Sequence, residues 1–227
     1  FNAQNRAVTK ADYITRVYSL PQKNGNIAKA YIVQDTQLQE NNDTTTEIQN
    51  PLALNMYLLG YDGNKYLATL NDAVKQNLKM YLSQYRLVTD AINLKNAYIV
   101  NIGIRFAIVT QRGFNQNDVL FRCIQRVRNH FNTDKWQINQ PIVLSDIAYQ
   151  ISLVDGVASV VPPDGTNPNN SLILVENKAT TLSGYSGNVY DIDSATKDGI
   201  VYPSKDPSIF ELKYPNTDII GRVVGEL

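Results

Sequence analysis

Apolar residues recur at helical spacing in two long segments. One segment begins at Asn115 and the other at Thr69, and an Asp stands three residues later in each, at Asp118 and Asp72. A side chain such as Asn or Thr can cap the first backbone amides, and an acid in the first turn suits the positive end of the helix. The pattern predicts helices whose apolar stripes are Val119, Leu120, Cys123, Ile124, Val127 and Phe131, and Val74, Leu78, Tyr81, Leu82 and Tyr85.

Two shorter helices are expected at other capping patterns. Thr9 stands three residues before Asp12, as in the longer segments, and Val8 and Tyr13 are placed to form a hydrophobic staple. The fourth helix is expected to begin at Ser145 and Asp146, with Leu144 and Tyr149 as its staple.

Strict alternation of apolar residues predicts strands between these helices. Residues 98–109 place Tyr98 and every second residue through Ile108 on one face, which predicts a strand of about 40 Å at ~3.3 Å per residue. Residues 28–35 and 51–60 predict two further strands, and the polar segment 36–50 between them predicts a solvated loop.

The order of these elements predicts an α+β fold, with helices packed on a mixed or antiparallel sheet. After residue 161 the texture changes to a turn-rich segment, 162–170, and then to short apolar runs separated by Gly, Pro and Asp. We therefore expect an α+β domain over 1–161 and a β-rich C-terminal module or arm over 162–227.

Composition narrows the function classes. The chain has 227 residues with 21 Lys+Arg and 21 Asp+Glu, so its zero net charge disfavours a nucleic-acid binder or a polybasic membrane anchor. No apolar run approaches the ~20 residues that span a bilayer, so we expect neither a nucleic-acid nor a membrane partner. A single cysteine excludes an internal disulfide and indicates a reducing compartment. The first residue, Phe1, and the lack of a signal-peptide pattern indicate a fragment of a longer protein.

Catalytic chemistry has few candidate residues. His130 is the only histidine and is expected near a helix C-terminus, and Cys123 lies on an apolar stripe, where cysteine behaves as a small hydrophobe. Asp191, Asp193 and Asp198 are the best metal candidates, but the EF-hand pattern fails at Thr196, so a solvated turn is the preferred interpretation. No glycine-rich phosphate loop occurs. We predict no enzymatic activity, no catalytic or metal-binding residue and no cofactor.

Two helix–turn–strand units resemble a known family. The segment 6–33, "RAVTKADYITRVYSLPQKNGNIAKAYIV", resembles the N-terminal signature of J-like baseplate proteins of contractile tails, and "QPIVLSDIAYQISLVDGVASVV" (140–161) resembles their C-terminal element. "AYIVNIGIRFAIV" (97–109) occupies the place of the family's central strand. The run from Asn188 to Val224 looks like the C-terminal part of the baseplate wedge proteins of T-even-type phages.

The resemblance implies a structural subunit of a contractile-tail baseplate wedge. Such proteins form homodimers, link wedges into a ring around the hub, contact other wedge proteins, and lie in the virion after assembly in the host cytoplasm. The surface of the Asn115 helix with Arg122 and Arg126, and the C-terminal residues Tyr202, Phe210 and Tyr214, are the predicted contacts. The alternative is a tail-associated receptor- or glycan-binding module, because the C-terminal third is rich in tyrosine and in strand-like runs.

Overall fold

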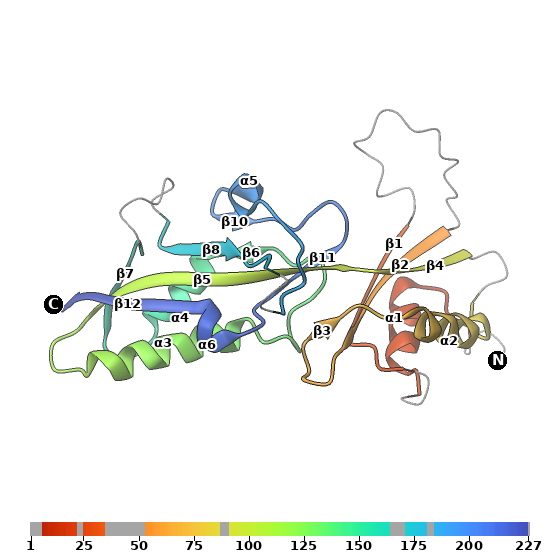
Figure 1. Cartoon of the computed structure of the whole chain (residues 1–227), viewed down its shortest axis with the longest axis horizontal. Coiled ribbons are helices and arrows are strands. Elements are labelled where there is room, and N and C mark those ends of the chain that lie inside the picture. The colour runs from red at the N-terminus through yellow and green to blue at the C-terminus, as the bar shows by residue number, and fades with distance from the viewer. Residues whose placement is uncertain are drawn as a thin grey trace. The chain divides into compact units, whose positions relative to one another are not determined.

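The structure is a computed structural model that describes residues 6–21, 25–34, 53–86, 91–163, 171–180 and 184–226. It has an α+β fold, as predicted (Figure 1). The elements in chain order are α1 (Lys10–Tyr18), β1 (Lys29–Gln34), β2 (Ala53–Tyr61), β3 (Leu67–Ala68), α2 (Asp72–Ser83), β4 (Ala91–Asn96), β5 (Tyr98–Thr110), α3 (Gln116–His130), β6 (Ile142–Val143), α4 (Leu144–Ser152), β7 (Val157–Val161), β8 (Ile173–Asn177), α5 (Ile192–Ala195), β9 (Thr196–Lys197), β10 (Ile200–Val201), β11 (Ser208–Glu211), α6 (Pro215–Asp218) and β12 (Ile219–Glu226).

The chain forms two compact units. Unit 1 comprises residues 1–98 and 205–208, and unit 2 comprises residues 99–204 and 209–227. This division differs from the one expected between residues 161 and 162, because β8, β11 and β12 pair with β5 and complete its sheet. The independence of 1–161 and 162–227 as domains stays a prediction.

Unit 1 is a four-stranded sheet covered by two helices. Strand β2 pairs antiparallel with β1 and parallel with β4, and β3 continues the sheet at the end of β2. Its core joins α1, α2 and the sheet through side chains that are at most 1% exposed: Tyr13, Val17, Met56, Leu58, Leu78 and Leu82. Burial of such side chains is the main stabilising contribution.

The capping patterns give most, but not all, of the helix starts. Thr9 and Asp12 form the complete capping box of α1, with the Thr9 N–H donating to Asp12 Oδ2 at 2.8 Å. Asn115 caps α3 as predicted. The cap of α2 is Asn71 rather than Thr69, since the Asn71 side chain accepts from the Val74 N–H at 2.9 Å.

The start of α4 differs from the prediction. The helix begins at Leu144, after Val143, which provides no side-chain cap. The Leu144 N–H instead donates to the Gly199 carbonyl at 2.9 Å, so a distant turn satisfies a backbone donor that a local side chain would otherwise satisfy. Tyr149 is 61% exposed and does not serve as the expected staple.

Unit 2 is organised around β5. Strand β12 runs parallel to β5, while β7 and β8 run antiparallel to it along its length. Helix α3 packs against β12 and α4, and α4 packs against β7 and β8, so both helices lie on the sheet (Figure 1). The alternation predicted for 98–109 is confirmed as a 13-residue strand, although residues on both of its faces are buried, including Asn101 and Ala107 at 0% exposure.

A second, small sheet adjoins α4 in unit 2. Strand β10 pairs with β6 on one side and β9 on the other. The β9–β10 turn contains Asp198 and Gly199, both with positive φ (52° and 76°), as a two-residue hairpin of the Asp-Gly type requires. The short helices α5 and α6 were not predicted, because four-residue helices carry no apolar periodicity.

Candidate interaction surfaces

The first predicted surface lies on α3. Arg122 and Asp118, one turn apart, form an ion pair at 3.0 Å, with side chains 38% and 62% exposed. Arg126 is exposed one turn further along, and Phe121 on the same helix is 59% exposed. The two charges therefore compensate each other within the helix, and the exposed Phe121 side chain lies beside them.

The second predicted surface is divided by burial. Tyr202 is 46% exposed, and its carbonyl accepts a hydrogen bond from the Tyr190 hydroxyl at 2.7 Å. Phe210 is only 2% exposed and packs against Tyr190, with ring centroids 5.9 Å apart. Tyr214 is half-buried against Tyr185. Whether any of these residues contacts a partner stays a prediction, as it does for Arg122 and Arg126.

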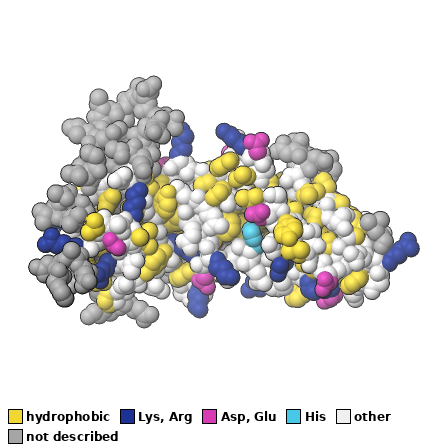
Figure 2. All heavy atoms as spheres, turned by 180° about the vertical axis from the view of Figure 1, so that it is seen from behind, with side chains coloured by type: hydrophobic (Ala, Val, Ile, Leu, Met, Phe, Trp, Pro, Cys, Tyr) yellow, Lys and Arg dark blue, Asp and Glu magenta, His cyan; other side chains and the backbone are white. Residues whose placement is uncertain are grey.

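Exposed apolar side chains on α4 were not predicted. Tyr149 and Leu153, one turn apart, are 61% and 50% exposed, and Phe114, just before α3, is 42% exposed. Figure 2 shows hydrophobic side chains at the surface beside the histidine. The buried stripe of α4 comprises Leu144, Ile147, Ala148 and Ile151, and Tyr149 lies off this stripe, which is the sequence signal for its exposure.

A buried carboxylate fixes the turn into β12. Asp218 is 2% exposed and accepts from the Tyr185 hydroxyl at 2.5 Å and from the Tyr214 N–H at 2.8 Å. Burial and this hydrogen bond raise the pKa of Tyr185 to about 12. These hydrogen bonds connect the segments around Tyr185 and Tyr214 to the start of β12, so the role of Asp218 is structural.

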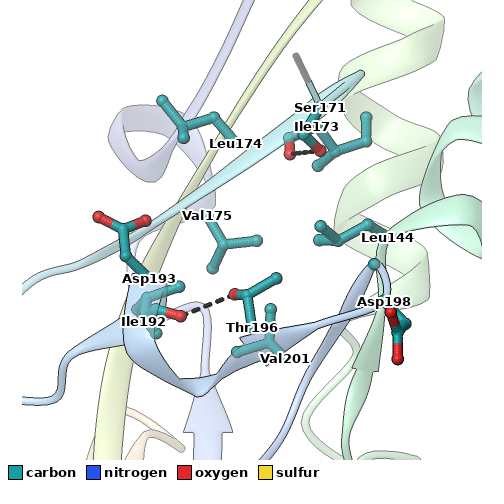
Figure 3. A pocket seen from close by; sticks show the side chains of 11 residues that line it. Leu144, Ser171, Ile173, Leu174, Val175, Ile192, Asp193, Thr196, Asp198 and Val201 are labelled. Atoms are coloured by element: carbon teal, nitrogen blue, oxygen red, sulfur yellow. Dashed lines mark hydrogen bonds between the residues drawn. The ribbon is translucent and has the colours of Figure 1, made fainter. Parts of the chain in front are cut away.

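A hollow in unit 2 lies beside β8 (Figure 3). It has a volume of about 390 Å³, and apolar side chains from four elements converge on it, among them Leu144, Val175, Ile192 and Val201. Asp193 and Asp198 stand at opposite ends of the group that lines it, as Figure 3 shows. Thr196 Oγ1 lies within and donates to the Ile192 carbonyl at 2.7 Å.

The side chains that were candidates for catalysis lie in surroundings that suit a structural role. Burial raises the pKa of the Cys123 thiol to about 11, which disfavours the reactive thiolate. His130 is half-buried between Phe131 and Trp136, and burial lowers its pKa, while the nearby Asp146 acts in the opposite direction.

The three candidate metal ligands do not form one site. Asp191 caps α5 by accepting hydrogen bonds from the Ser194 hydroxyl and, at 3.1 Å, from the Ser194 N–H, and these bonds lower its pKa. Within the described ranges, no three His, Cys, Asp or Glu side chains are grouped so that they could hold a metal ion. Over the same residues, no helix combines the length and apolar character that crossing a bilayer needs.

The comparisons with known proteins give a fold relationship. No family model matches the sequence, and no curated protein matches it. Among solved structures, the chain is similar to one in the cryo-EM structure of the anti-feeding prophage (AFP) baseplate, 6-fold symmetrised, with a TM-score of 0.53 and 12% sequence identity. The match covers 92% of this chain and 38% of that one, so this chain spans well under half of its length. At this identity the likeness is one of fold, and it extends over both units.

Proposed function

We propose that the chain is a structural subunit of a contractile-tail baseplate. The observation that carries the proposal is a fold shared over 92% of the chain with a component of a contractile particle's baseplate. The two helix–turn–strand units that resemble J-like baseplate proteins support it independently, because they were identified from sequence. The proposal includes two finer points, that the chain belongs to the J-like family and that it lies in a baseplate wedge.

In this role the chain pairs with itself and with other wedge proteins, and it links wedges into a ring around the hub. It acts in the virion-like particle after assembly in the host cytoplasm, without catalysis, cofactor, nucleic acid or membrane. Zero net charge supports close association because it gives little mutual repulsion. Exposed Phe121, Tyr149 and Leu153 provide the kind of apolar area that protein interfaces bury.

Light scattering of the purified chain tests self-association. One copy has a mass of 25.5 kDa, and we expect a species of at least twice that mass. A strictly monomeric chain at a concentration on the order of 100 μM would place any dissociation constant above that of typical homodimers. That result would refute self-association through this chain.

Labelling of particles tests the location. Gold-conjugated antibodies against this chain should bind purified contractile particles at the end of the tail that carries the baseplate. Label along the sheath, or particles that never carry it, would contradict the proposal. A particle type that lacks the gene is the matched control.

The alternative function, a receptor- or glycan-binding module, would need exposed aromatic side chains around one hollow. Around the three described hollows, Tyr190 is the one aromatic residue. No observation on the described residues therefore favours this alternative. A glycan array would test it directly.

A further inference from the structure

Strand β8 has an edge that faces away from its sheet. It pairs antiparallel with β5, with Leu174 opposite Arg105, and within the described residues it has no other strand partner. The Lys178 N–H donates to the Asn101 carbonyl at 2.8 Å just beyond β8, which fixes the alternation of the ladder. Residues 174 and 176 therefore bond to β5, whereas the N–H and C=O groups of residues 173 and 175 point outward.

One of these outward groups is already used. The Ser171 hydroxyl donates to the Ile173 carbonyl at 2.7 Å (Figure 3). Among the residues that the structure describes, no group bonds to the N–H or the C=O of Val175, so both can bond to a strand that pairs at this outer edge. A strand edge of this kind is the usual template for an incoming extended chain.

A continuous groove follows this edge. The hollow of about 390 Å³ and a second one of about 380 Å³ share Leu174, Val175, Ile192 and Asp193. Helix α5 and the β9–β10 turn form the opposite wall. Figure 3 shows Val175, Ile192 and Val201 converging on the first hollow, so the base of the groove is apolar.

The charges along the groove have one sign. Its lining, as far as the structure describes the chain, includes Glu176, Asp191, Asp193 and Asp198, and no Lys or Arg. Glu176 is neutralised by Arg105 at 3.0 Å and Lys178 at 3.4 Å, and Asp191 is engaged as the cap of α5.

The two remaining acids are not neutralised. Asp193 and Asp198 are exposed and make no ion pair in the part of the chain that the structure describes. Two carboxylates thus flank an apolar floor beside an outward-facing backbone, which disfavours an anionic ligand and suits a cationic one.

We propose that this groove docks an extended segment of a partner protein, which adds a strand to β8. The segment places a β-branched or other apolar side chain over the apolar floor and a Lys or Arg beside Asp193 or Asp198. Main-chain hydrogen bonds to Val175 supply affinity, and the flanking charges select the sequence. The inference does not rest on the proposed function, because it follows from the groove alone.

A random dodecapeptide library, panned against the full chain, tests the proposal. We expect enriched peptides that alternate β-branched or apolar residues with polar ones and that carry Lys or Arg. Synthetic copies of the enriched peptides should bind about tenfold more weakly to the double variant Asp193→Asn, Asp198→Asn, and binding should weaken with added salt. Asp155→Asn, an exposed carboxylate outside the groove, is the matched control and should leave binding unchanged.

A backbone variant separates strand addition from simple charge attraction. Val175→Pro removes the outward N–H while leaving the ladder to β5 without a lost donor, as proline at a strand edge does. Its unfolding transition should persist and peptide binding should be lost. If Val175→Pro does not fold, enriched peptides with N-methylated backbone amides supply the same test, because N-methylation removes the donors that would bond to the Val175 carbonyl while keeping the peptide's charges. Failure to enrich any peptide class, or equal binding to the chain and to the double variant, would overturn the proposal.

Discussion

The close approach of α3 to β12 at Gly221 gives a quantitative prediction about unit 2. A Cβ atom at this position would lie 2.6 Å from Phe106 Cζ and 2.7 Å from Leu120 Cδ1. Reaching an ordinary contact of 3.4 Å would require a displacement of about 0.8 Å. Leu120 is half-buried and can rotate, but Phe106 is 0% exposed beneath the helix and has no space to enter.

We therefore expect Gly221→Ala to lower the free energy of unfolding by about 1–3 kcal/mol, the usual cost of overpacking a core. Gly225→Ala is the matched control in the same strand, because the nearest atom to its Cβ is Val109 Cγ1 at 4.0 Å. This variant should be neutral or more stable by up to about 1 kcal/mol, since alanine reduces the entropy of the unfolded chain.

Urea unfolding followed by tryptophan fluorescence measures both variants. Trp136 is the only tryptophan, is 5% exposed and belongs to unit 2, so its emission reports the unit that carries the substitutions. Equal stabilities of the two variants, within about 0.5 kcal/mol, would refute the close approach of α3 to the strand.

Three further predictions concern buried polar and titratable groups. Asp218→Asn should lower the unfolding free energy by about 1–3 kcal/mol in the urea assay, because the amide places a donor against the Tyr185 hydroxyl or the Tyr214 N–H. Substitution of the exposed Asp155 by Asn should cost little, and equal effects of the two substitutions would contradict the role of Asp218. Cys123, with its pKa raised to about 11 and 0% exposure, should react with a thiol reagent at pH 8 orders of magnitude more slowly in the folded chain than in the guanidinium-unfolded chain; comparable rates would show that the thiol is accessible. Burial lowers the pKa of His130 in the folded state below its value of 6.5 in the unfolded state, so the unfolded chain binds the proton first as the pH falls; the contribution of His130 to stability should be complete above pH 6.5 and be lost as the pH drops toward the folded pKa. Urea titrations over about pH 5.5–7 should therefore show that the unfolding free energy depends less steeply on pH in His130→Gln than in the unsubstituted chain. An unchanged dependence would exclude this contribution.

Local patterns predicted the elements that local forces determine. The alternation of residues 98–109 and the caps at Thr9 and Asn115 depend on neighbours in sequence, and the structure confirms them. The start of α4 depends on a hydrogen bond from Leu144 to Gly199, and no window of sequence contains that partner. Strand β4, "AINLKN", has too few apolar positions to reveal that it pairs with the central strand of unit 1.

The candidate surfaces were less predictable than the fold. The burial of Phe210 follows from the face that β11 turns to its sheet, which the sequence alone leaves undetermined, whereas Tyr149 lies off the apolar stripe of α4 and was wrongly expected to pack as a staple. The groove beside β8 arises because residues 144, 173–175 and 192–201 converge from five elements. The sequence offered Asp191, Asp193 and Asp198 as metal candidates or a solvated turn; in the structure Asp191 caps α5, and Asp193 and Asp198 line the hollow beside β8.

The parallel pairing of β12 with β5 joins residues more than a hundred positions apart, as in the hydrogen bond from Thr110 to Gly225 across 115 positions. During synthesis, α3 and β5 leave the ribosome well before residues 219–226 exist. Until then the edge of β5 that pairs with β12, and the part of α3 that packs on β12, lack this native partner. Newly made chains should therefore depend on chaperones, or on prompt completion, to avoid aggregation at this site, and parallel pairing over such a separation should make this step slow.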